Sequence, residues 1–148
     1  MAVQQTTSAG QDTGDTFATG IVLEHPIELV WDAISRKAWI DRYYFLPINA
    51  DVTTVGGALF YGSPDAKLIT GVVLAFEPQQ LLKHSFRFTG EVDKTETIVT
   101  YSLSVAGQGT HLRVEQQGYA AGSQGFADVA GGWPLILDQL KAVLAARK

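Results

Sequence analysis

Two side chains that could move protons in a reaction, His84 and Tyr101, fall at positions that the sequence places inside the fold. In the segment 81–88, LLKHSFRF, successive side chains point to opposite faces of a strand. The charged Lys83 and Arg87 share one face, so the other face, which carries His84, is predicted to face the core. The same alternation over 98–106 turns Tyr101 inward. Because imidazole titrates near neutral pH, His84 is the best candidate for a general acid or base. Tyr101 would then donate a hydrogen bond to a developing oxyanion.

A third polar residue, Gln116, is predicted to face inward among apolar neighbours. Two interpretations of this polar set stay open. In the first, each group bonds a neighbour or a buried water inside a packed core. In the second, the groups line an apolar cavity and orient a ligand. The residues expected to line that cavity are Trp39, Tyr43, Phe60, His84, Phe86, Tyr101, Gln116, Trp133 and Leu137.

Several other chemistries lack the residues they need. The chain has no cysteine, which excludes disulfides, thiolate nucleophiles and cysteine metal sites. The three histidines, His25, His84 and His111, form no close-spaced pair of metal-ligand type. No G-x-S-x-G elbow occurs, and Gly56-Gly57 lacks the spacing of a phosphate-binding loop. We therefore expect no metal and no cofactor.

The pattern along the chain predicts the elements that position these residues. Alternation over 17–23 indicates a strand, and helical spacing follows over 26–35 and 36–46. Period-two segments then fill 49–63, 66–90 and 95–119, with turns at Gly56-Gly57, Pro78 and Gly107. The final segment, 125–148, is predicted to be helical. This order indicates an α+β fold, in which one long helix covers an antiparallel sheet of about six to seven strands.

The stretch 130–140, AGGWPLILDQL, is unusual for a helix. Gly131, Gly132 and Pro134 are poor helix residues, and a proline removes the bond to the carbonyl four residues earlier. We expect a loose or kinked entry over 129–132, which could gate the interior, and regular helix from about Pro134. Trp133 is expected to begin an apolar stripe against the sheet.

The length and net charge of the chain limit the class of protein and the partners that we expect. The 148 residues suit one domain, expected over 16–148 after a disordered polar tail at 1–15. The formal charge is −4, and no run of Lys or Arg occurs, so we expect no nucleic-acid partner. No signal peptide and no membrane-spanning run are visible, which favours a cytoplasmic protein without membrane insertion.

Five segments in order carry a family resemblance: HPIELVWDAISRKAWIDRYYF, GGALFYG, GVVLAFEPQQLLKHSF, GTHLRVEQQGY and GGWPLILDQLKAVL. Together they resemble the family of the C-terminal domain of the activator of the heat-shock-protein-ninety ATPase. That family belongs to the START-like, or SRPBCC, superfamily. The resemblance implies a helix-grip fold, with a curved sheet around the C-terminal helix and two small helices closing one end. Superfamily members often hold an apolar ligand between sheet and helix, and some are polyketide cyclases.

Three functions follow from the residues and the resemblance, in order of preference. The first is a binding protein for a small apolar, aromatic or lipid-like molecule. The alternative is a cyclase-type or other enzyme acting in the cavity through His84 and Tyr101. The third is a chaperone partner, ranked last because the short segment before the first strand leaves no room for the activator's additional N-terminal domain. A homodimer is also expected, since open sheet edges need cover.

Overall fold

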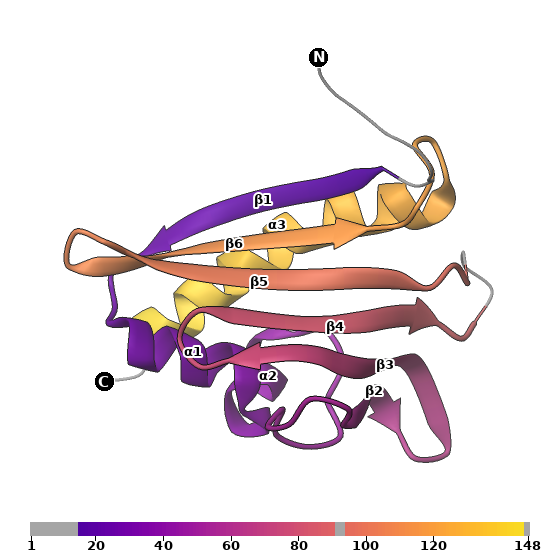
Figure 1. Cartoon of the computed structure of the whole chain (residues 1–148), viewed down its shortest axis with the longest axis horizontal. Coiled ribbons are helices and arrows are strands. Elements are labelled where there is room, and N and C mark those ends of the chain that lie inside the picture. Colours follow the sequence, from indigo (N-terminus) through magenta and orange to yellow (C-terminus); the bar gives the residue numbers. More distant parts are fainter. Residues whose placement is uncertain (1–14, 91–93, 147–148) are drawn as a thin grey trace.

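The computed structural model describes residues 15–90 and 94–146, and most of the predicted polar tail lies outside these ranges. It confirms the α+β helix-grip fold. One antiparallel sheet of six strands, in the order β1-β6-β5-β4-β3-β2, curves around the long helix α3 (Figure 1). In chain order the elements are β1 (Thr16–Leu23), α1 (Ile27–Ser35), α2 (Lys37–Tyr43), β2 (Ala58–Ser63), β3 (Ala66–Glu77), β4 (Leu81–Phe88), β5 (Thr97–Ala106), β6 (Gly109–Gln117) and α3 (Gln124–Ala145).

The sheet has six strands because the segment before Gly56-Gly57 does not form one. Only an isolated bridge joins Ile48 to Tyr61, and the chain then runs as a loop to β2. This loop satisfies part of its backbone elsewhere, since the Val52 N–H donates to the Ser35 carbonyl at 2.7 Å. The loop is thereby fixed to the end of α1 rather than to a sheet edge.

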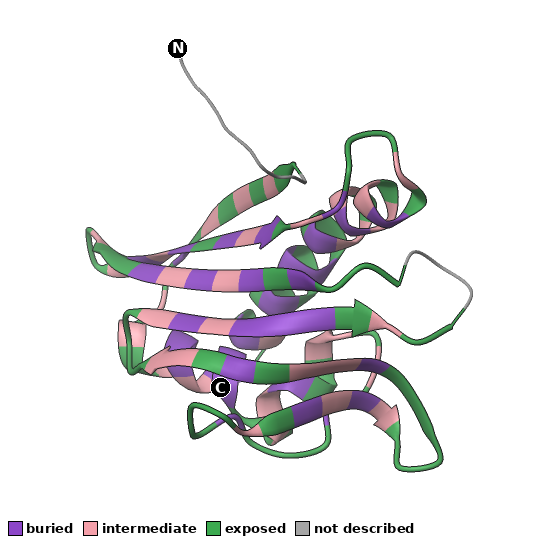
Figure 2. Ribbon diagram, turned by 45° about the vertical axis from the view of Figure 1, so that its right-hand side comes forward, coloured by how far each residue is buried: buried purple, intermediate pink, exposed green. Residues whose placement is uncertain are grey.

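Strand alternation follows the sequence prediction. Along β4 the side chains of Leu82, His84 and Phe86 are buried, while Arg87 on the other face is exposed. Figure 2 shows this as alternating bands of burial along the strands, with the buried side of α3 against the sheet. The apolar core therefore lies between the inner face of the sheet and the three helices, with α1 and α2 beside the C-terminal half of α3 (Figure 1).

Helix α3 is continuous from Gln124 to Ala145, so the expected loose entry over 129–132 is wrong. Ser123 caps the helix by accepting a hydrogen bond from the Phe126 N–H at 3.1 Å. Pro134 lies on the exposed side, so the carbonyl that it leaves unbonded within the helix can bind water. Burial of the opposite stripe, which begins at Val129 and Trp133, holds the helix against the sheet and overrides local propensity.

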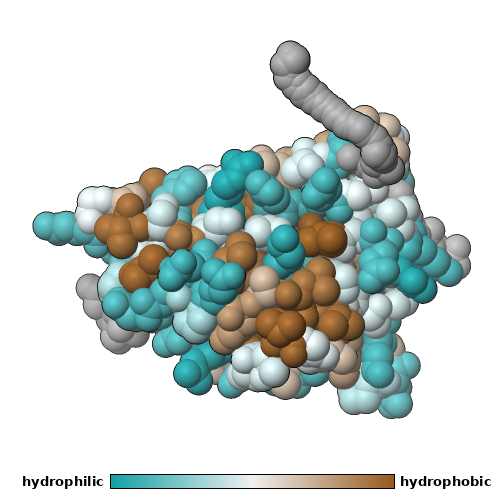
Figure 3. All heavy atoms as spheres, in the orientation of Figure 1, coloured by the Kyte–Doolittle hydropathy of each residue, from teal (hydrophilic) through white to brown (hydrophobic). Residues whose placement is uncertain are grey.

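The outer face of the sheet keeps some apolar side chains in solvent. Val72 and Ile98 are both exposed, and Ser85 lies between them, with its Oγ accepting from the Val72 N–H at 2.9 Å. Figure 3 shows hydrophobic atoms gathered on this face, over the lower strands of the view. None of the helices in the described ranges is long and apolar enough to cross a membrane.

Candidate ligand-binding groove

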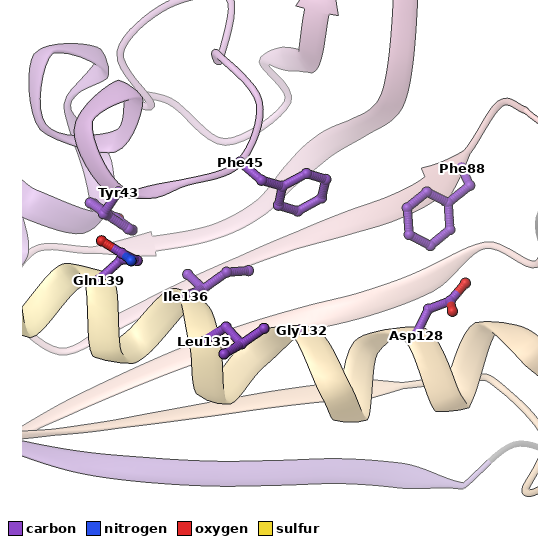
Figure 4. A pocket seen from close by; sticks show the side chains of 8 residues that line it. All are labelled: Tyr43, Phe45, Phe88, Asp128, Gly132, Leu135, Ile136 and Gln139. Atoms are coloured by element: carbon purple, nitrogen blue, oxygen red, sulfur yellow. The ribbon is translucent and has the colours of Figure 1, made fainter.

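A groove of about 430 Å³ runs between α3 and the segment that follows α2 (Figure 4). One wall is the outward side of α3, and the other comes from the end of α2, the next loop and the end of β4. Its walls are almost entirely apolar. The lining residues are Tyr43, Phe45, Phe88, Asp128, Gly132, Leu135, Ile136 and Gln139.

Helical spacing explains why one side of α3 forms a wall. The lining positions 128, 132, 135, 136 and 139 recur at three and four residues and so share one face. This face lies next to the buried stripe that includes Val129 and Trp133, and Ile136 belongs to both. Leu135 is 68% exposed on the helix and Phe45 is 62% exposed on the opposite loop, so both present apolar surface to solvent at the groove. Single exposed apolar residues are common, but two that share one groove indicate a binding surface.

Gly132 lies in the middle of this wall and widens the groove. A Cβ added there would meet no atom within 4 Å, so packing does not require a glycine. Its φ is not in the left-handed region, so the backbone does not require one either. Glycine inside a helix is less stable than alanine by about 0.5–1 kcal/mol. The chain thus tolerates a small loss of helix stability at a position where a side chain would project into the groove.

A smaller space of about 40 Å³ continues the groove toward the core. It shares Phe45, Phe88, Asp128, Gly132 and Ile136 with the groove. The residues that it adds are Tyr44, Phe86, Gln116, Val129 and Trp133. The groove therefore reaches inward past Gly132 to the face of the Trp133 indole.

Hydrogen bonds fix the inner end of this space. The Trp133 Nε1–H donates to Gln116 Oε1 at 2.9 Å, and Gln116 Nε2 donates to Thr97 Oγ1 at 2.9 Å. The Thr97 hydroxyl in turn donates to the Phe86 carbonyl at 3.1 Å. This chain links α3 to β6, β5 and β4. Because the indole N–H is already bonded, Trp133 presents a fixed apolar surface rather than a free donor.

The two catalytic candidates lie deeper than the groove. His84 and Tyr101 are buried, with ring centroids 6.0 Å apart, and Tyr101 packs edge-on against Trp133 at 5.9 Å. His84 Nδ1 donates to the Ser85 carbonyl at 2.8 Å. Burial lowers the pKa of His84 and raises the pKa of Tyr101 well above its ordinary value, so both are neutral at pH 7. Neither lines the groove.

The structure places the other predicted lining residues in different surroundings. Tyr43 lines the groove, and its hydroxyl donates to the Ala33 carbonyl at 2.7 Å. Phe86 and Gln116 line the inner extension, whereas Leu137 is buried in the core. Trp39 lies away from the groove, with the Arg42 guanidinium 4.9 Å from its ring centroid.

Phe60 is on the other face of β2 from the one that the cavity prediction required. Its ring lies under the Lys67 ammonium at 4.9 Å from the centroid, while its neighbour Tyr61 is buried. Tyr61 packs on Tyr44 with centroids 4.5 Å apart, and Tyr44 is 6.4 Å from Trp133. Strand parity was the signal for this, because Leu59 and Tyr61 must share a face that excludes Phe60.

The expected lining residues did not include Phe45, Asp128, Gly132, Leu135, Ile136 or Gln139, although the stretch 129–132 was expected to gate the interior. The three- and four-residue spacing of the α3 positions can be seen in the sequence. However, a stripe that contains a glycine, an aspartate and a glutamine has no hydrophobic periodicity that would mark it as a site. Over the described ranges, no group of three or more His, Asp or Glu residues could hold a metal ion.

The sheet that wraps around a long C-terminal helix, with two short helices after the first strand, defines the START-like class. The chain matches the family of Activator of Hsp90 ATPase homolog 1-like proteins over residues 24–145 and belongs to that family. No curated protein matches the sequence significantly.

Solved structures share this fold at low sequence identity. Protein MLL2253 from Mesorhizobium loti superposes with a TM-score of 0.81 at 23% identity, over 90% of this chain and 99% of that one. CalU16 from Micromonospora echinospora gives 0.74 at 24% identity, over 89% and 77% of the two chains. The Aha1 dimer from Colwellia psychrerythraea gives 0.73 at 15% identity, over 90% and 98%.

Proposed function

We propose that this protein binds a small, mainly apolar molecule in the groove between α3 and the Phe45 loop. The observation that carries the proposal is Gly132, an unconstrained glycine inside a helix at the position where a side chain would narrow the groove. A volume of about 430 Å³ also falls in the range of small-molecule sites. Each ligand methylene buried there contributes about 0.8 kcal/mol.

Binding is favoured over catalysis by where the proton-transfer candidates lie. Tyr101 packs against Trp133, and neither Tyr101 nor His84 lines the groove or its inner extension, so a ligand in the groove would touch neither of them. Among the described lining residues, Asp128 is the only one with a carboxylate side chain. A cyclase-type reaction would therefore need the substrate to displace the hydrogen-bonded Trp133.

Two measurements test the proposal. The first is native mass spectrometry of the protein as purified, in which a retained ligand adds mass that disappears on denaturation. The second is titration with the neutral fluorescent probe N-phenyl-1-naphthylamine, whose emission rises in apolar sites. Saturable binding with one site per chain supports the proposal. A linear, non-saturable response together with no retained mass would contradict it.

The homodimer stays a prediction, and so does the chaperone contact that we ranked last. The dimeric state of the Colwellia neighbour supports the first, and the family name supports the second. Light scattering of the full chain would give twice the chain mass of 16.0 kDa for a dimer. A pull-down with the host Hsp90-type chaperone would test the chaperone contact, and a result in which the chaperone is not retained would contradict it.

A further inference from the structure

We propose that the groove selects ligands whose polar end is a protonated amine, held by the Asp128 carboxylate at the end of the groove near Phe88. This inference rests on the proposed binding function and specifies the chemical class of its ligand. Three features of the described residues carry it: the sign of the charge in the groove, the unused hydrogen-bond acceptor positions of the carboxylate, and the aromatic rings that line the groove.

Asp128 is the only charged side chain among the described residues that line the groove. Figure 4 shows its carboxylate at one end, directed toward Phe88, while the neutral Gln139 lies at the other end. A ligand carboxylate would thus meet a like charge at one end and only a neutral amide at the other, with no cationic side chain among the described lining residues. The formal charge of the chain, −4, also disfavours anionic ligands.

The carboxylate of Asp128 has capacity for a further donor. Its Oδ1 accepts one hydrogen bond, from Gln124 Nε2 at 2.7 Å. No Lys or Arg of the described ranges forms an ion pair with it. An ionised carboxylate has about four acceptor positions, so most of them face the groove or water. A ligand ammonium, with three donors, is the complementary group.

Aromatic rings that line the same groove as the carboxylate also suit a cation. Phe45 and Phe88 line the groove together with Asp128, and both also line its inner extension. The face of an aromatic ring attracts an ammonium group within about 6 Å of its centroid. The remaining lining residues Leu135 and Ile136 would then contact an apolar tail that runs toward Gln139. From residue 128 to residue 139 the helix rises by about 16 Å at 1.5 Å per residue, which suits an extended tail.

The test compares three compounds with the same tail: dodecylamine, 1-dodecanol and dodecanoate, each displacing N-phenyl-1-naphthylamine below its micelle concentration. We expect dodecylamine to displace the probe about tenfold more tightly than the alcohol, and dodecanoate to be the weakest, because charge-assisted bonds exceed neutral ones. In Asp128→Asn the affinity for the amine should fall to within about threefold of the affinity for the alcohol.

Asp138→Asn is the matched control, because it removes the same charge from an exposed position of α3 outside the groove lining. It should keep the amine preference. Equal displacement by amine and alcohol, or equal effects of the two variants, would overturn the inference while leaving the proposed function in place. If the probe and all three compounds fail to bind, the proposed function falls with it.

Discussion

The Trp133 indole N–H donates to Gln116 Oε1 at 2.9 Å, and this bond attaches the middle of α3 to the C-terminal end of β6. Both residues are almost fully buried, with exposed fractions of 3% and 1%. The amide end of Gln116 continues the chain to Thr97. The bond therefore holds the inner wall of the groove at a fixed depth, and it accounts for a glutamine on an otherwise apolar strand face.

Replacing Gln116 with Met should destabilise the protein, because the Trp133 N–H would lose its partner inside the core. A buried donor left unsatisfied costs about 1–3 kcal/mol in the free energy of unfolding. Urea unfolding followed by Trp fluorescence measures the change. Gln117→Met, at the exposed neighbouring position of β6, is the control and should change stability by less than about 0.5 kcal/mol. Equal stability of the two variants would show that the buried bond contributes nothing.

Pro134→Ala should stabilise the protein. The substitution restores a helical hydrogen bond to Ala130, and Pro134 is exposed, so no buried contact is lost. A proline inside a helix is less stable than alanine by about 3 kcal/mol, offset in part by the greater freedom of the unfolded variant. We expect a gain of about 1–2 kcal/mol in urea unfolding. A loss of stability would mean that the packing of α3 depends on the shape that the proline imposes.

His84 should make stability depend on pH. Burial lowers its pKa in the folded state, so the unfolded chain binds the proton more strongly. Its contribution is complete above about pH 6.5, the ordinary value, and is lost as the pH falls from there toward the folded pKa. The slope from this one group is at most about 1.4 kcal/mol per pH unit.

Unfolding at pH 8 and pH 5 tests this pH dependence. The difference between the two pH values should be smaller in His84→Gln than in the wild type. His111→Gln, at a half-buried position on the outer face, is the comparison and should leave the difference unchanged. If His84→Gln retains the full pH dependence, other groups cause it.

Strand alternation was enough to place the inward polar residues. His84, Tyr101 and Gln116 each lie between polar or charged neighbours in the sequence, so the alternation favoured one parity. Phe60 and Tyr61 were harder, because both faces of β2 carry an aromatic ring there. A register shift between Tyr61 and Gly62 then changes the pairing with β3, and no local pattern announces it.

The groove could not be predicted because it depends on tertiary packing. Asp128 and Gly132 are 85 and 89 residues from Tyr43 in sequence, and only the docking of α3 beside α2 brings the two walls together. The expectation of a loose or kinked helix entry over 129–132 was wrong for the same reason. Helix rules describe an isolated segment, whereas α3 is held by a capping serine and by a stripe buried against the sheet.

Titration of Gly132→Leu with N-phenyl-1-naphthylamine tests the central claim most directly. A leucine there would project into the groove from the middle of its helical wall, while Gly131→Leu puts the same side chain on the adjacent exposed position, outside the lining. Both substitutions raise helix propensity by a similar amount, so neither should lower stability. We predict that Gly132→Leu weakens probe binding at least tenfold while Gly131→Leu binds like the wild type. Unchanged binding in Gly132→Leu, with the fold intact by circular dichroism, would contradict the assignment of this groove as the ligand site.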